Sequence, residues 1–182
     1  MLFVAALSST LSFAAELPGD SIYRLPIALT DHAGNDFRLT ARRGTVQLVS
    51  MFYTSCQYVC PLIIDTLRKT QRELNGDEQA RLDVLLVSFD PERDSVARLG
   101  EVFAERKLDA ATWTLARTDA PSVRKLAAVL GVQYRALANR DISHSSSIVL
   151  LDADGRIVAR TDKLGDIDPD FVAAMHALLS KH

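Results

Sequence analysis

The chain has 182 residues, 48% of them hydrophobic and 24% charged, which suits one globular domain with a single buried core. The net charge is −2 at pH 7 and the basic residues are scattered, so we expect no nucleic-acid partner. No internal repeat, low-complexity tract or linker divides the sequence.

The N-terminal segment is apolar. Residues 1–14 have the length of a signal-peptide h-region, are too short to span a bilayer and end in Ser-Phe-Ala, a spacing that favours cleavage after Ala14. No Lys or Arg precedes the apolar run, and an N-terminal core element is the alternative interpretation. We interpret residues 1–14 as a signal-peptide remnant and expect one exported domain at 15–182. A longer natural N-terminus could instead act as a membrane anchor.

The first half of this domain is predicted to contain a hairpin, a strand and a helix. Residues 27–41 show two alternating runs around Gly34-Asn35, a pattern typical of a β-hairpin. The mostly apolar run 45–54 predicts a buried strand. Pro61 is expected to open a helix, where its missing N–H costs nothing, and Asn75-Gly76 to end it.

The second half continues to alternate strands with helices. Residues 82–90 predict another buried strand, and Asp94 can cap the helix that follows it. The remaining predicted elements are a strand, a helix that ends at Gly131, a hairpin around Asp154-Gly155 and an amphipathic helix, at residues 112–117, 120–131, 146–160 and 168–180. This order predicts an α/β fold, a thioredoxin-like mixed sheet flanked by helices, with an N-terminal hairpin and a late hairpin added to it.

The two cysteines lie where the first core strand meets its helix, which is where thioredoxin-like proteins carry their thiol site. A helix N-terminus favours a thiolate, and one helical turn between Cys56 and Cys60 would place both sulfurs on one side. They could form a disulfide, share a metal ion or be two small buried hydrophobes. A purely structural disulfide would close a very small loop and stabilise little.

His144 is the best candidate for a third functional group. It precedes the first strand of the final hairpin, which we expect beside the first core strand, so the imidazole should face the thiols. Two thiolates and an imidazole form a soft ligand set suited to Cu(I), and with a further ligand to Cu(II). Zinc would also accept these ligands, although structural zinc normally has four from the protein. The other histidines, His32, His176 and His182, are expected at the surface or the rim.

Four motifs carry a resemblance to a known family: FYTSCQYVCP, VSFDPERDS, TWTL and DISHSSSIVLLDADG. In this order and spacing, over about residues 20–180, the chain resembles the Sco/SenC family of copper-binding, thioredoxin-like proteins associated with cytochrome oxidase assembly. The resemblance implies that Cys56, Cys60 and His144 bind copper, one per chain.

Other positions match the family pattern less simply. Asp90, Pro91 and Asp94 match a family fingerprint that we interpret as a loop and helix cap near the site. The family commonly has an acidic residue directly before the histidine, whereas this chain has Ser143, with Asp141 two positions earlier. Asp141 could still orient the imidazole of His144.

The expected function is a copper metallochaperone, periplasmic or otherwise exported, that delivers copper to the binuclear copper site of a terminal oxidase. Its expected partners are the copper-bearing oxidase subunit and an upstream copper donor or thiol reductant, and it would meet the membrane only through a partner or an anchor. The main alternative is a thiol–disulfide oxidoreductase in which Cys56 and Cys60 are the redox pair. Such enzymes usually have Cys-x2-Cys and a proline facing the thiols, and no proline lies near His144. A peroxiredoxin-like peroxidase and a non-catalytic interaction domain are weaker alternatives.

Overall fold

The computed structural model describes residues 16–56, 59–136 and 142–180, so the predicted signal-peptide segment lies outside it. Within these ranges the main sheet has seven strands: β1 (Ala28–Asp31), β2 (Asp36–Arg38), β3 (Val46–Phe52), β4 (Leu82–Ser88), β5 (Trp113–Arg117), β8 (Ile148–Leu151) and β9 (Ile157–Thr161). A second sheet pairs β6 (Tyr134–Ala136) with β7 (Ile142–His144). The helices are η1 (Ile22–Arg24), η2 (Leu39–Arg42), α1 (Val59–Arg72), α2 (Gly76–Gln79), α3 (Val96–Glu105), α4 (Ala120–Leu130) and α5 (Pro169–Leu179).

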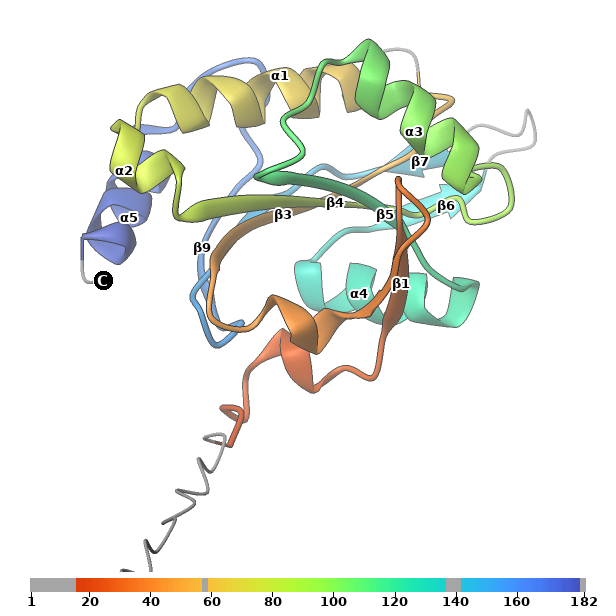
Figure 1. Cartoon of the computed structure of the whole chain (residues 1–182), viewed down its shortest axis with the longest axis horizontal. Coiled ribbons are helices and arrows are strands. Elements are labelled where there is room, and N and C mark those ends of the chain that lie inside the picture. Colours follow the sequence, from red (N-terminus) through yellow and green to blue (C-terminus); the bar gives the residue numbers. More distant parts are fainter. Residues whose placement is uncertain (1–15, 57–58, 137–141, 181–182) are drawn as a thin grey trace, which may run out of the picture.

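The main sheet is mixed and has the order β2-β1-β5-β4-β3-β8-β9. Strands β3, β4 and β5 run parallel, whereas β8 joins β3 and β1 joins β5 in the antiparallel sense. Helices α1 and α3 cover one face of the sheet and α4 covers the other, while α5 packs beside β9 (Figure 1). This arrangement confirms the predicted thioredoxin-like fold with hairpins at both ends of the chain.

Burial explains why the central strands read as apolar runs in the sequence. Every residue of β3 is buried, and from Val84 onward so is every residue of β4, because helices cover both faces of the sheet. Within the described ranges no helix combines the length and the apolar character needed to cross a bilayer.

Two predicted helix boundaries were wrong. Cys60 lies inside the first turn of α1 rather than ahead of it. Pro61 does not have to be the first helical residue, because no N–H in the first turn of a helix is needed for a hydrogen bond within the helix. Asn75-Gly76 begins α2 instead of ending α1: the Asn75 side chain accepts from the Glu78 N–H, and the Glu78 carboxylate accepts from the Asn75 N–H. This capping box is a start signal that the sequence also contains.

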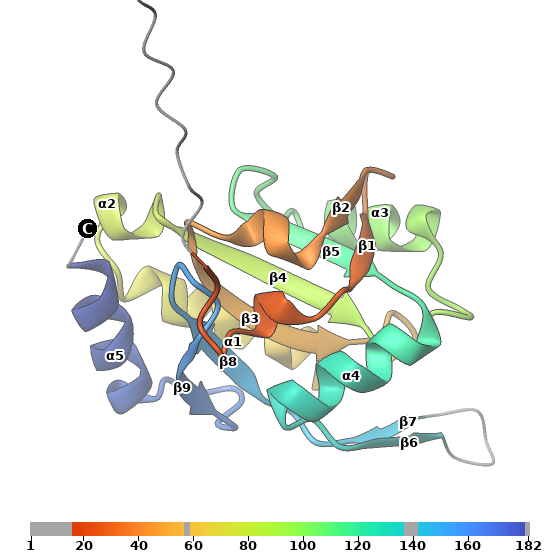
Figure 2. The same cartoon turned by 90° about the horizontal axis from the view of Figure 1, so that it is seen from below.

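The β6–β7 ribbon was not predicted. Tyr134 pairs with His144 and Ala136 with Ile142, so His144 ends a short strand instead of lying in a loop. Figure 2 shows the ribbon standing apart from the main sheet, beyond α4. Antiparallel pairing of β8 with β3 is as predicted, and it brings the chain that follows His144 to the end of β3.

Candidate metal centre

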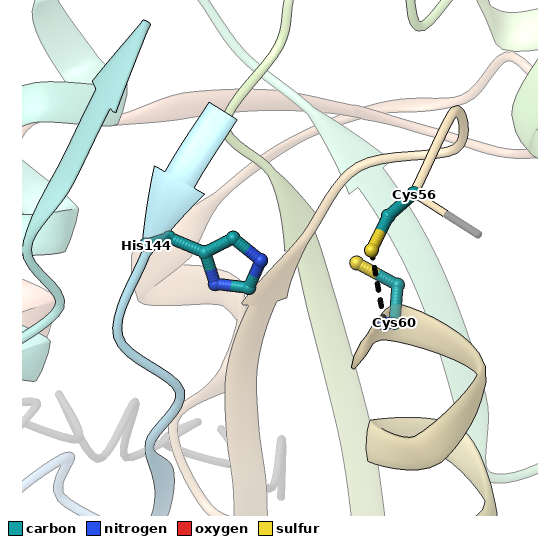
Figure 3. A group of neighbouring side chains, drawn as sticks. All are labelled: Cys56, Cys60 and His144. Carbon is teal, nitrogen blue, oxygen red and sulfur yellow. Dashed lines mark hydrogen bonds between the residues drawn. The ribbon is translucent and has the colours of Figure 1, made fainter. Parts of the chain in front are cut away.

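Three potential ligand atoms converge at the carboxyl end of β3. The sulfurs of Cys56 and Cys60 and a ring nitrogen of His144 all lie within 4.8 Å of one another. Cys56 comes from the β3–α1 connection, Cys60 from the first turn of α1 and His144 from the end of β7 (Figure 3). This is the grouping of side chains that the sequence predicted.

Cys56 is held by a turn at the end of β3. Its N–H donates to the carbonyl of Tyr53 at 3.3 Å, which closes the turn. Its sulfur accepts the N–H of Cys60 at 3.3 Å, drawn as the dashed line in Figure 3. The free N–H groups at the start of a helix provide such donors, and they stabilise negative charge on the sulfur of Cys56.

Cys60 lies deeper, with 3% of its surface exposed. Burial raises the pKa of the Cys60 thiol well above its ordinary value; the N–H of Tyr53, 3.3 Å from the sulfur, lowers the pKa, and the neighbouring Cys56 raises it further. The expected preference of the helix start for a thiolate is therefore outweighed at Cys60 by the loss of solvent. A metal ion bound there must replace the thiol proton, so binding releases that proton.

His144 is oriented by the backbone of the next residue and by two aromatic rings. Its Nδ1 lies 3.1 Å from the carbonyl oxygen of Ser145 and can donate to it, which leaves Nε2 as the acceptor. The ring centroid is 4.8 Å from that of Phe89 and 5.7 Å from that of Tyr53, the latter in an edge-on arrangement. In Figure 3 the imidazole faces the two sulfurs.

Asp94 does not cap α3, contrary to the prediction. Ser95 is the N-cap, and its hydroxyl accepts from the Arg98 N–H at 3.1 Å. The Asp94 carboxylate is fully buried and accepts from the Thr54 N–H at 3.1 Å, from the Thr54 hydroxyl at 2.5 Å and from the Ser88 hydroxyl. It therefore ties the end of β4 to the chain two residues before Cys56, and these tertiary bonds replace the local capping bond.

The other two fingerprint residues shape the loop that follows β4. Asp90 accepts from the Arg93 guanidinium, and its N–H donates to the Ser88 hydroxyl at 3.0 Å. The carbonyl of Pro91 accepts from Arg117 at 2.7 Å. They form a loop near the site, as predicted, but contribute no ligand to the three-atom group.

His32 and His176 lie away from this group. His32 stacks on Phe103 with 3.7 Å between ring centroids, and His176 contacts the carboxylate of Glu78 at 2.9 Å. Both side chains are partly buried, in keeping with a rim position. His182 and Asp141 lie outside the described residues, so the suggested role of Asp141 stays a prediction.

Sequence reasoning missed the roles of Tyr53, Phe89 and Thr54. All three belong to the motifs that flank the ligands, FYTSC and VSFDP. Aromatic residues directly after buried strands were the available signal, because side chains at the ends of neighbouring parallel strands meet at one edge of a sheet.

A family model described as SCO1/SenC matches residues 16–179, nearly the whole described chain. The chain belongs to the SCO1/SenC family. A SCO1 protein homolog of Bacillus subtilis is 24% identical to this SCO1/SenC protein over 140 residues, which cover 73% of this chain and 70% of the relative.

Solved structures share its fold. The Bradyrhizobium japonicum ScoI with copper bound aligns with a TM-score of 0.70 and 23% identity, over 85% of this chain and 98% of that one. BsSco, described as a Sco-family cytochrome c oxidase assembly protein with a disulfide switch, aligns with a TM-score of 0.72 and 20% identity, over 87% and 94% of the two chains.

The donor set of the site fits a copper ion. Thiolates and imidazole nitrogen are ligands that Cu(I) and Cu(II) accept in proteins. Three donors from the protein leave room for a further ligand on the ion.

Proposed function

We propose that this SCO1/SenC protein is an exported copper metallochaperone that delivers copper to the binuclear copper site of a terminal cytochrome oxidase. One copper ion is the cargo of each chain, and Cys56, Cys60 and His144 hold it. The observation that carries this proposal is the convergence of their three ligand atoms within 4.8 Å. Family membership and the copper-bound ScoI relative support it.

The ligands have different roles in uptake and release. Cys60 is buried, so its sulfur is the inner anchor, whereas Cys56 is partly exposed and lies on a connection rather than inside a regular element. His144 comes from a separate ribbon, and its Nε2 completes the set. An acceptor's thiols or imidazoles would replace the ligands one at a time, beginning with the more accessible Cys56.

Export and periplasmic location belong to the same proposal. The relatives of known structure include a SCO1/SenC family lipoprotein of Bacillus anthracis, with a TM-score of 0.74 and 21% identity. Thiol sites that cycle between free and disulfide forms suit such an oxidising compartment. The acceptor would be the copper-bearing oxidase subunit, and an upstream copper donor or thiol reductant would serve the cysteines.

A thiol–disulfide oxidoreductase is the second candidate. The sulfurs of Cys56 and Cys60 lie within 4.8 Å of each other, close enough for redox exchange. In that role Cys56 and Cys60 would reduce the cysteines of the copper acceptor and prepare them to bind metal.

An in vivo rescue experiment separates these two functions. Cells that carry Cys56→Ser should lose oxidase activity, and a carrier predicts that added copper restores it. An oxidoreductase predicts rescue by an added membrane-permeant thiol and no rescue by copper. Wild-type oxidase activity in cells with Cys56→Ser and Cys60→Ser together would contradict both.

A further inference from the structure

We propose that the pocket between the cysteines and α3 binds small thiols that carry a carboxylate, and that such thiols reduce an oxidised Cys56–Cys60 pair from this side. This inference rests on the cysteine pair of the proposed function and adds the substrate class of its reductant.

The pocket lies beside the sulfurs and has a volume of about 270 Å³. Cys56, Cys60 and Pro61 line one side, and Arg98, Glu105 and Arg106 line the other. His144 is not part of its lining, so a molecule in the pocket reaches the sulfurs without displacing the imidazole. The volume falls below the usual range for drug-sized ligands, which favours a small molecule.

The charges of the lining favour an anion. Arg98 is engaged by Glu101 at 2.8 Å and Glu105 at 3.9 Å, which largely balances its charge. Arg106, which is partly buried, forms no ion pair with any residue of the described ranges. Its guanidinium is therefore the cation available to a ligand carboxylate, and a planar guanidinium suits a carboxylate well.

The accessibility of the two sulfurs fixes the order of the steps. The ligand thiolate attacks the partly exposed Cys56 sulfur, so a ligand–Cys56 disulfide forms and the Cys56–Cys60 bond breaks. The electron pair goes to the Cys60 sulfur, which takes a proton. A second thiolate then attacks the ligand sulfur, releases the oxidised ligand as its symmetrical disulfide and leaves Cys56 reduced. Two thiols are oxidised and one protein disulfide is reduced.

Two thiols of similar size and opposite charge test this idea. Mercaptopropionate carries a carboxylate and cysteamine an ammonium group, and each is reacted with the oxidised full chain, followed by quenching, alkylation and mass spectrometry. With rates expressed per thiolate, we expect mercaptopropionate to be favoured. Arg106→Gln should lower the ratio of the two rates about three- to fivefold, the range of an exposed ion pair. Arg106→Lys should largely keep the ratio, and Arg106→Glu should lower it further.

Arg124→Gln is the matched control, because it removes the same charge from α4 on the other face of the sheet. Its ratio should equal that of wild type. An Arg106→Gln ratio that is unchanged, or a ratio that falls equally in Arg124→Gln, would overturn the proposal. Reaction with a protein thiol but with neither small thiol would also overturn it. Copper stoichiometry is measured on every variant. If the wild type binds no copper, the proposed function fails. If copper binding is intact but the ratio of the two thiol rates does not depend on Arg106, only the proposed role of the pocket is contradicted.

Discussion

Asp94→Ala removes the fully buried carboxylate that ties the end of β4 to the cysteine loop. Three donors lose their acceptor: the Thr54 N–H, the Thr54 hydroxyl and the Ser88 hydroxyl. An unsatisfied buried donor costs about 1–3 kcal/mol, and the two hydroxyls can rotate toward other acceptors while the N–H cannot. The unsatisfied N–H accounts for about 1–3 kcal/mol and the displaced hydroxyls add to it, so we expect the free energy of unfolding to fall by about 2–4 kcal/mol. Because the Thr54 N–H fixes the chain near Cys56, copper affinity should also fall, about tenfold or more.

Urea unfolding of the metal-free protein and competitive titration with a Cu(I) chelator measure the two effects. Ser95→Ala is the matched control at the neighbouring position, since it removes the true N-cap of α3. It should cost about 1 kcal/mol and leave copper affinity unchanged. If Asp94→Ala were as mild as Ser95→Ala, or if it lowered stability with no effect on copper affinity, the assignment of Asp94 to the cysteine loop would be wrong.

Three further changes test other parts of the molecule. In a redox titration, His144→Ala should keep the reduction potential of the Cys56–Cys60 pair within about 30 mV of wild type, about 1.4 kcal/mol for two electrons. The absorption spectrum of the same variant should lose the Cu(II)–thiolate band. An unaltered spectrum with a shifted potential would favour the oxidoreductase. Gly155→Ala should lower the free energy of unfolding, measured in urea, by about 2–4 kcal/mol. The φ of +78° is strained for alanine, and the added Cβ would lie 2.5 Å from the Tyr23 ring. The control Gly76→Ala should be nearly neutral, because no atom lies within 4 Å of its added Cβ. The Ser122 N–H and hydroxyl lower the pKa of Asp119, so Asp119→Ala should destabilise the protein at neutral pH, and the difference should vanish in acid unfolding as the pH falls through the lowered pKa; a difference that persists in strong acid would contradict this cause.

The ligand grouping could be predicted because it depends on topology. Cys56 and Cys60 both follow the end of a strongly apolar strand, and β8 pairs with that same strand, so His144 is brought to its end. Each of these signals is long and regular enough to be recognised in the sequence. The same is true of the hairpins around Gly34 and Gly155, whose φ values of +89° and +78° are the ones that glycine permits most easily.

The features that sequence reasoning missed depend on long-range or very short-range information. Asp94 and Thr54 are 40 residues apart in the chain. The local sequence does not show that Asp94 is an acceptor for this distant residue and that its neighbour Ser95 is the N-cap of α3. The strands β6 and β7 have three residues each, too few for an alternating pattern to be recognised. Asn75-Gly76 reads equally well as a helix stop and as a helix start, and the Glu78 side chain decides for the start.

The central claim is that Cys56, Cys60 and His144 together hold one copper ion. X-ray absorption spectroscopy of the reduced protein loaded with one equivalent of Cu(I) tests it most directly, because it reports the elements bonded to the metal. We predict two sulfur ligands and one imidazole nitrogen in the wild type, with only the nitrogen signal lost in His144→Ala. A wild-type spectrum without sulfur ligands, or stoichiometric copper retained by the Cys56→Ala, Cys60→Ala double variant, would contradict the account.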